Sequence, residues 1–186
     1  MQFSRFQQIG LWILAVASLV TALSLLWWAG LPERADFSGF VIDGIYVAPE
    51  IGGIAPPIEA GTLSGERVSL ADFRGESVVI NFWATWCAPC AIEMPELQSL
   101  HEETGVPILG VNIAEPEQFI DVWVDEYALT FDIVLDPDSI IYEQYRVIGQ
   151  PSTYVVSPDG IITHIFYGPT TGNTLRIAIN THQHDG

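Results

Sequence analysis

Cys87 and Cys90 are the only cysteines in the chain, and Ala-Pro separates them. They follow residues 77–83, whose β-branched apolar character predicts a buried strand, and a helical pattern begins within a few residues. A thiol in the first turn of a helix faces unpaired backbone N–H groups and the positive end of the helix dipole. Both favour the thiolate, so the spacing predicts a dithiol/disulfide redox site with Cys87 as the nucleophile.

Other uses of this cysteine pair fit the sequence less well. Two cysteines cannot complete a Cys₄ zinc site without a second chain, and a bridge across two residues constrains the unfolded chain little. A Cu(I)-carrying metallochaperone is the alternative of a different class, because thiolates are soft ligands. It would need a distant histidine, for which His164 is the only candidate in the later strands. The neighbours of His164 do not indicate a ligand loop, so no metal site is predicted.

The composition narrows the choice of partners. The 186 residues include 23 Asp and Glu against six Arg and no Lys, for a net charge of −17. Such a surface cannot neutralise phosphates, which argues against nucleic acid, and it is poorly suited to anionic lipid headgroups. No glycine-rich dinucleotide fingerprint is present, so no NADPH or flavin site is expected. The expected redox group is the Cys87–Cys90 disulfide itself, without any further cofactor.

The first 31 residues are predicted to form a signal-anchor transmembrane helix. Residues 9–31 are uncharged and predominantly apolar, and this length spans a bilayer. Arg5 and the N-terminal amine would place the N-terminus in the cytoplasm and the following domain on the periplasmic side. The alternative is a cleaved secretory signal, although the run is longer than a usual signal core and lacks a clear small-x-small site. Either way, we expect an exported domain.

Residues 32–50 read as a tether, and residues 51–186 as one domain of alternating strands and helices. Glu115-Pro116 is expected to begin a helix that carries Phe119, Val122, Trp123 and Tyr127 inward. Strand, helix, strand and helix followed by a hairpin and a final helix predict an α/β fold with a mixed sheet flanked by helices. The expected elements are a hairpin over 62–70, strands at 77–83, 107–112, 131–135, 152–156 and 161–167, and helices ending near 103, 127, 145 and 180.

Four phrases of the sequence resemble the TlpA/ResA-like branch of the thioredoxin fold, a family of membrane-anchored thiol-disulfide oxidoreductases. Their number and order make the likeness specific, whereas a lone Cys-x-x-Cys would be weak. The resemblance implies an extracytoplasmic reductant, often of apocytochrome c or copper-site cysteines, recharged by a membrane thiol electron carrier. The phrases are Asn81-Phe-Trp-Ala-Thr-Trp-Cys-Ala-Pro-Cys90, Glu93-Met-Pro95, Gly110-Val-Asn112 and Val147-Ile-Gly-Gln-Pro-Ser-Thr153.

The resemblance also implies a substrate-binding surface. Pro151 would be the cis-proline that faces the disulfide, although from the chain alone it reads as a trans turn proline. The backbone of Gln150 would then pair with an extended substrate peptide, strand to strand. Trp86 is expected to contribute to an apolar rim beside the cysteines. Ser152 departs from the acid common there in dedicated cytochrome c maturation thioredoxins, which leaves copper-site or general reduction open.

Glu93 is the candidate proton acceptor. Thioredoxin itself carries a buried acid at the position of Asn81, and an amide cannot take a proton from the resolving cysteine. The TlpA/ResA-like branch shares this Asn and has an acid three residues after the second cysteine, where Glu93 can share a helix face with Cys90. If Glu93 is buried, its raised pKa would suit proton transfer. The alternative is a solvated helix acid.

The expected reaction begins with attack of the Cys87 thiolate on a disulfide in a partner protein. Cys90, deprotonated through Glu93 or water, then resolves the mixed disulfide. A disulfide-forming oxidase would run the same chemistry in reverse. A peroxide-reducing peroxiredoxin would need a Pro-x-x-x-Thr-x-x-Cys pattern, whose spacing Thr85-Trp-Cys87 does not provide.

Overall fold

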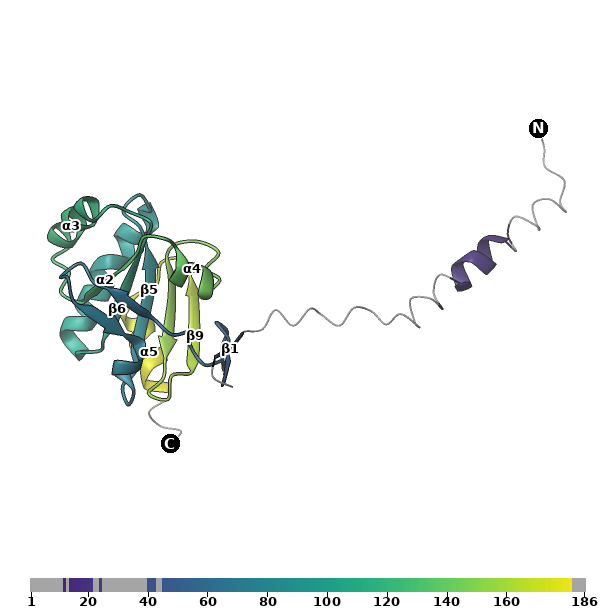
Figure 1. Cartoon of the computed structure of the whole chain (residues 1–186), viewed down its shortest axis with the longest axis horizontal. Coiled ribbons are helices and arrows are strands. Elements are labelled where there is room, and N and C mark those ends of the chain that lie inside the picture. Colours follow the sequence, from purple (N-terminus) through teal and green to yellow (C-terminus); the bar gives the residue numbers. More distant parts are fainter. Residues whose placement is uncertain (1–11, 13, 22–23, 25–39, 43–44, 182–186) are drawn as a thin grey trace. The chain divides into compact units, whose positions relative to one another are not determined.

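The computed structural model describes residues 12, 14–21, 24, 40–42 and 45–181, and the chain divides into two units, Met1–Phe37 and Ser38–Gly186 (Figure 1). Most of the predicted signal-anchor over residues 1–31, and residues 32–39 of the predicted tether, lie outside the described residues. Residues 14–21 are helical. None of the helices that the structure describes combines the length and the apolar character needed to cross a membrane.

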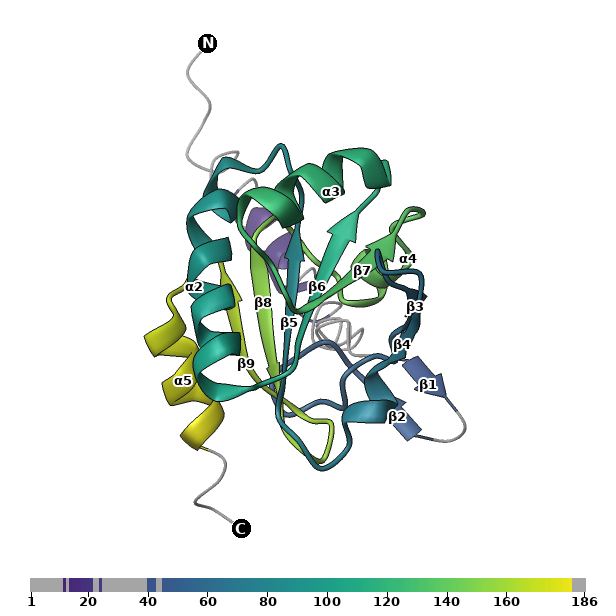
Figure 2. The same ribbon diagram turned by 90° about the vertical axis from the view of Figure 1, so that its left-hand side faces the viewer.

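A five-stranded mixed sheet forms the centre of the second unit, in the order β7-β6-β5-β8-β9 (Figure 2). β5 is parallel to β6, and β6 to β7, whereas β8 is antiparallel to both β5 and β9. All six residues of β5 are buried, as expected for the central strand of a sheet covered on both faces. The strands are β5 (Val78–Trp83), β6 (Ile108–Ile113), β7 (Asp132–Asp136), β8 (Ser152–Val156) and β9 (Ile162–Tyr167).

Two apolar clusters hold helices against the two faces of this sheet. On one face, Val79 and Trp83 of β5 pack with side chains of α2 (Ala88–Thr104), α3 (Glu117–Glu126) and α5 (Gly172–Thr181). On the other face, Ile80 and Phe82 pack with α4 (Ile140–Gln144). The alternation along β5 assigns Asn81 to the same face as Trp83, beneath α2. The predicted mixed α/β fold is therefore confirmed.

The N-terminal part of the second unit contains two short hairpins. The predicted tether includes the strands β1 (Phe40–Ile42) and β2 (Ile45–Val47), which pair antiparallel. Val47 and Ala48 are buried, which a solvated tether would not require. The hairpin predicted over 62–70 is present but begins earlier in the chain, as β3 (Glu59–Gly61) and β4 (Arg67–Ser69), followed by the 3-10 helix η1 (Leu70–Phe73).

The inward face of α3 differs from the prediction. Phe119 and Val122 are 52% and 61% exposed, whereas Ile120 is fully buried. Two overlapping sets of apolar residues in this segment recur at the helical period, one with Phe119 inward and one with Ile120 inward. Tertiary packing determines which set faces the core. The Trp123 ring stacks on Trp83 at a centroid distance of 5.5 Å, which turns Ile120 towards the sheet and Phe119 towards solvent. The prediction was right for Trp123 and wrong for Phe119 and Val122.

The start of α4 is capped by Asp136 at the end of β7 and not by the residue directly before the helix. Ser139 has a left-handed backbone (φ 58°) and makes no capping side-chain bond. The carboxylate of Asp136, at the end of β7, instead accepts the backbone N–H groups of Ile141 (3.2 Å) and Tyr142 (2.9 Å). The acid therefore satisfies two of the unpaired donors at the helix start.

Candidate active site

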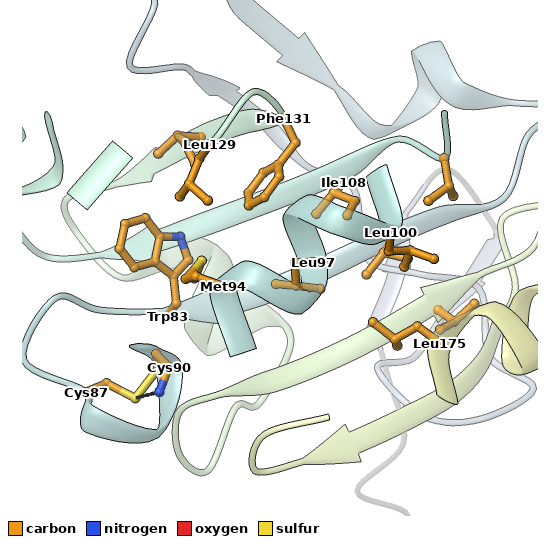
Figure 3. Close-up of a cluster of buried hydrophobic side chains, with 14 of the residues drawn as sticks. Trp83, Cys87, Cys90, Met94, Leu97, Leu100, Ile108, Leu129, Phe131 and Leu175 are labelled. Atoms are coloured by element: carbon orange, nitrogen blue, oxygen red, sulfur yellow. Dashed lines mark hydrogen bonds between the residues drawn. A yellow bond between two sulfur atoms is a disulfide. The ribbon is translucent and has the colours of Figure 1, made fainter. Parts of the chain in front are cut away.

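Cys87 and Cys90 form a disulfide at the corner between β5 and α2 (Figure 3). Cys87 is the N-cap residue, and its sulfur accepts the backbone N–H of Cys90 at 3.3 Å. Pro89 lies in the first turn, where its missing N–H has no intrahelical partner to lose. Cys87 is 5% exposed and Cys90 is fully buried, so Cys87 is the more accessible of the two residues. This order of access suits Cys87 as the attacking group.

The disulfide rests on the apolar cluster between α2 and the sheet. Trp83 and Met94 belong to the same buried cluster as the two cysteines (Figure 3), and the ring of Trp123 stacks on the indole of Trp83. Gly110 on β6 leaves room for this indole, because a Cβ there would approach Trp83 Nε1 to 3.2 Å and Phe131 Cε2 to 2.8 Å. The first turn of α2 is therefore fixed against a rigid surface.

Glu93 is fully buried, one turn after Cys90. Its Oε2 accepts a hydrogen bond from Asn81 Nδ2 (2.8 Å), and its Oε1 accepts from Thr153 Oγ1 and from the backbone N–H of Thr170, both at 3.1 Å. Burial raises the pKa of the Glu93 carboxyl, and these three donors partly oppose the shift. The expected burial and raised pKa are confirmed, and the role in proton transfer stays a prediction.

The Gln150–Pro151 peptide bond is cis, as the resemblance implies. It directly precedes β8, and the Pro151 carbonyl accepts the backbone N–H of Gly168 at 2.8 Å. Pro151 is buried and Gln150 is half-buried. Trp86 and Ile148 are 68% and 83% exposed, so two large apolar side chains near the redox motif and the proline face solvent. Their use in substrate binding, like that of Gln150 and Pro151, stays a prediction.

Sequence reasoning missed the residues that hold the Cys87 loop. Glu115 Oε2 accepts the backbone N–H of Thr85 at 2.7 Å and Asn112 Nδ2 at 2.8 Å, and the Thr85 hydroxyl bonds to Oε1. A signal was present, because Glu115 follows β6 just as Thr85 follows β5. The carboxyl ends of parallel neighbouring strands meet at one edge of a sheet. Thr153 and Thr170, which contact Glu93, were also missed.

In the part of the chain that the structure describes, no three His, Cys, Asp or Glu side chains gather around a common point. His164, the histidine considered for copper, lies in β9 and stacks on Phe166 at a centroid distance of 6.1 Å. Its Nδ1 is 3.1 Å from Thr163 Oγ1. The dithiol is therefore the only soft ligand pair of the sequence, without a described third ligand.

A mixed sheet with a disulfide at a strand–helix corner, and a cis-proline before the next antiparallel strand, defines a thioredoxin-like thiol-disulfide oxidoreductase. The chain belongs to the AhpC/TSA family, whose profile matches residues 51–165. It is 35% identical over 132 residues to the thiol-disulfide oxidoreductase ResA of Geobacillus thermodenitrificans, covering 69% of this chain and 76% of that protein. The resemblance to ResA-like proteins is therefore confirmed.

Further comparisons agree on this enzyme class. The thioredoxin-like protein YneN of Bacillus subtilis is 35% identical over 156 residues, covering 78% of this chain and 91% of YneN. Among solved structures, a DsbF homologue from Corynebacterium diphtheriae has a TM-score of 0.64 and 27% identity, covering 77% of this chain and 98% of that one. StoA from Bacillus subtilis has a TM-score of 0.59 and 27% identity, covering 66% and 96%.

Proposed function

We propose that this protein reduces disulfides in partner proteins outside the cytoplasm, with apocytochrome c or copper-site cysteines as the substrate class. The observation that carries the proposal is the buried Glu93 one turn after the buried Cys90. Cys90 has to lose a proton before it can resolve a mixed disulfide, and a carboxylate of raised pKa accepts a proton more readily than a solvated one. The similarity to ResA supports the same chemistry.

In the proposed reaction, the Cys87 thiolate attacks one sulfur of the partner disulfide, and the other partner sulfur leaves as a thiolate. Glu93 takes the Cys90 proton, directly or through water. The Cys90 thiolate then attacks the Cys87 sulfur, so the mixed disulfide breaks and the second partner sulfur leaves. Two electrons pass to the partner, and the chain ends as the Cys87–Cys90 disulfide that the structure contains.

The spent disulfide needs an electron donor. Because the sequence has no dinucleotide fingerprint, we propose a membrane thiol carrier as the donor. The predicted signal-anchor would keep the domain near such a carrier, on the periplasmic side of the membrane. Disulfides persist in oxidising compartments, so a reductase there requires this supply. A secreted disulfide oxidoreductase of Mycobacterium tuberculosis supports an exported location, with 25% identity and a TM-score of 0.62.

The reduction potential of the Cys87–Cys90 couple tests the proposed direction. The full-length protein is equilibrated with defined ratios of oxidised and reduced dithiothreitol or glutathione, and the reduced fraction is measured by thiol labelling. A value near or below about −270 mV, that of thioredoxin, is expected for a dedicated reductant. A value near about −120 mV would make the protein a disulfide-forming oxidase and end the reductive proposal.

A second measurement tests the substrate class. The reduced protein is mixed with an oxidised Cys-x-x-Cys-His peptide, as in apocytochrome c, or with glutathione disulfide, and reduction is followed by mass spectrometry. The peptide should be reduced faster, because the exposed Trp86 and Ile148 can contact a peptide but find little surface on glutathione. Equal rates with both oxidants would contradict a protein substrate. The Cys87→Ser variant serves as the control without a nucleophile.

A further inference from the structure

Two side chains that bond Glu93 can reverse their hydrogen-bonding role without moving the chain: the Asn81 amide, by turning over, and the Thr153 hydroxyl, by rotating its hydrogen. Asn81 is fully buried, and its Nδ2 donates to Glu93 Oε2 (2.8 Å) and to Thr153 Oγ1 (2.9 Å). Its Oδ1 is also buried and has no hydrogen-bond partner among the described residues. A buried acceptor without a donor is uncommon and calls for an explanation.

The contact between Asn81 and Glu93 Oε2 suits a carboxyl group that carries no proton on Oε2. Asn81, Thr153 and the Thr170 backbone each donate a hydrogen bond to its carboxylate. If the proton is on Oε2, two donors, the Glu93 O–H and the Asn81 N–H, face each other across 2.8 Å. A proton on Oε1 would instead be donated to Thr153 Oγ1, which already accepts from Asn81. An acid that gains and loses a proton in each catalytic cycle needs a partner for both states.

Reversal of the Asn81 amide supplies that partner. A half-turn about its terminal torsion exchanges Oδ1 and Nδ2 with almost no change in the shape of the side chain. Oδ1 then lies at hydrogen-bonding distance from Glu93 Oε2 and Thr153 Oγ1, and it can accept from both hydroxyl groups. The N–H group moves to the place where Oδ1 had no partner, so the reversal sacrifices no existing bond on that side.

We propose that Asn81 is a positioning residue that reverses its amide in step with the proton on Glu93. With Glu93 ionised, Nδ2 donates to the carboxylate. When the carboxylate accepts the proton of the Cys90 thiol, its new O–H donates to Oδ1 of the reversed amide, and the return of the proton restores the first arrangement. This inference deepens the proposed function, since it rests on Glu93 as the proton acceptor for Cys90.

Among the residues that the structure describes, no charged group contributes to the raised pKa of Glu93. The causes of its raised pKa are burial and the donors Thr170, Asn81 and Thr153, which come from the 168–171 loop, β5 and β8. On α2, the titratable neighbours along the helix are Cys90, held in the disulfide, and Glu96, whose Oε2 accepts the Gly172 N–H at 2.9 Å. An aspartate at position 81 would add a second titrating acid, whereas an amide changes only its orientation.

The test follows both groups by NMR in the oxidised full-length protein, with ¹³C-labelled glutamate and ¹⁵N-labelled asparagine. The scalar coupling across the hydrogen bond from Asn81 Nδ2 to Glu93 Cδ should be present above the Glu93 titration midpoint. Below it, the coupling should vanish, because the N–H then points away from the carboxyl. Persistence of the coupling in the protonated protein would overturn the proposal, and this outcome requires no variant.

A substitution at Asn81 provides the second test of the proposal. Asn81→Leu removes a hydrogen bond worth about 1.5–3 kcal/mol from the ionised form of Glu93 and one worth about 0.5–1.5 kcal/mol from the protonated form. The proton affinity of Glu93 should therefore rise by the difference, roughly fivefold. Gln98→Met is the matched control, because Gln98 is a buried amide of α2 that bonds Thr130 and Glu102. It should lower stability and leave the Glu93 midpoint in place. An unchanged midpoint in Asn81→Leu would refute the role of Asn81.

These outcomes separate the inference from the proposed function. The titration is made in the oxidised protein without a partner, so it stands whatever the reduction potential proves to be. If the reduction potential is that of an oxidase but the scalar coupling disappears on protonation of Glu93, the amide reversal stands. Only the proposed direction of electron flow is then wrong. If the potential is that of a reductant and the coupling persists, the proposed function stands and the amide reversal does not.

Discussion

The burial of Glu93 makes the stability of the folded protein depend on pH. Its pKa is raised above the usual 4.5 in the folded protein, chiefly by burial, whereas in the unfolded chain it returns to its ordinary value. Below that ordinary value both states are protonated. As the pH rises towards the folded pKa, the unfolded state releases its proton first, so the folded state loses stability across this window and regains none above it.

Replacement of Glu93 by glutamine should abolish this loss, because the amide stays neutral. We expect Glu93→Gln to be more stable than the wild type near neutral pH, and the difference should shrink towards about pH 4. Urea unfolding at a series of pH values measures it. The exposed Glu66→Gln is the control for a general charge effect. A difference that does not vary with pH would contradict the argument.

At the level of single residues, the sequence predicted the reacting side chains better than the residues that hydrogen-bond to them. The spacing of Cys87, Cys90 and Glu93 on one helix is local, and the helical period alone places Glu93 on the face of Cys90. Thr153 and Thr170 reach the same carboxyl from 60 and 77 residues away in the chain. Nothing in their own neighbourhoods distinguishes them, since only the β5–β8 pairing brings Thr153 opposite Asn81.

Among the elements, the loop between β5 and α2 depends on a residue of another loop. Glu115 satisfies the Thr85 N–H and hydroxyl two residues before Cys87. Ala114, directly before it, has φ 53°, a left-handed conformation that costs a non-glycine residue about 1–3 kcal/mol. This arrangement directs the Glu115 carboxylate at the active-site loop.

Removal of that carboxylate should loosen the loop. Glu115→Ala leaves the half-buried Thr85 N–H without its partner, and we expect a loss of about 1–3 kcal/mol in the free energy of unfolding. The alkylation rate of Cys87 in the reduced protein should also change, because its N-cap geometry is no longer held. Urea unfolding and iodoacetamide labelling measure the two effects. Glu117→Ala, at an exposed acid two residues further on, is the control, and equal behaviour of the two variants would contradict the loop contact.

The order of elements was predictable because each strand and helix carries a local pattern. Tertiary packing decided what those patterns left open. In α3, Phe119 and Ile120 fit two overlapping stripes, and the contact between Trp123 and Trp83 selects the one with Ile120 inward. The β1–β2 hairpin escaped prediction because its three-residue strands are too short for a period of two to be recognised.

At the scale of the whole molecule, acidic charge is almost uncompensated. The chain has 23 Asp and Glu against six Arg. Within the residues that the structure describes, Arg176 and Glu103 form the single ion pair. On α3, Glu117, Asp121 and Asp125 recur four residues apart, a spacing at which like charges repel. Self-repulsion of this kind destabilises the compact state, and salt screens it.

We therefore expect the melting temperature to rise as NaCl increases, with most of the change complete near about 0.15 M, where the screening length has fallen to about 8 Å. Calorimetry of the oxidised protein at constant pH measures the rise. Asp121→Lys turns two repulsive contacts on α3 into attractive ones, at about 0.2–0.5 kcal/mol each. This variant should melt higher than the wild type at low salt and depend less on added NaCl. If the melting temperature of both the wild type and the variant does not change with NaCl, the prediction is wrong. Water alone then screens the acidic side chains, and their repulsion does not limit stability.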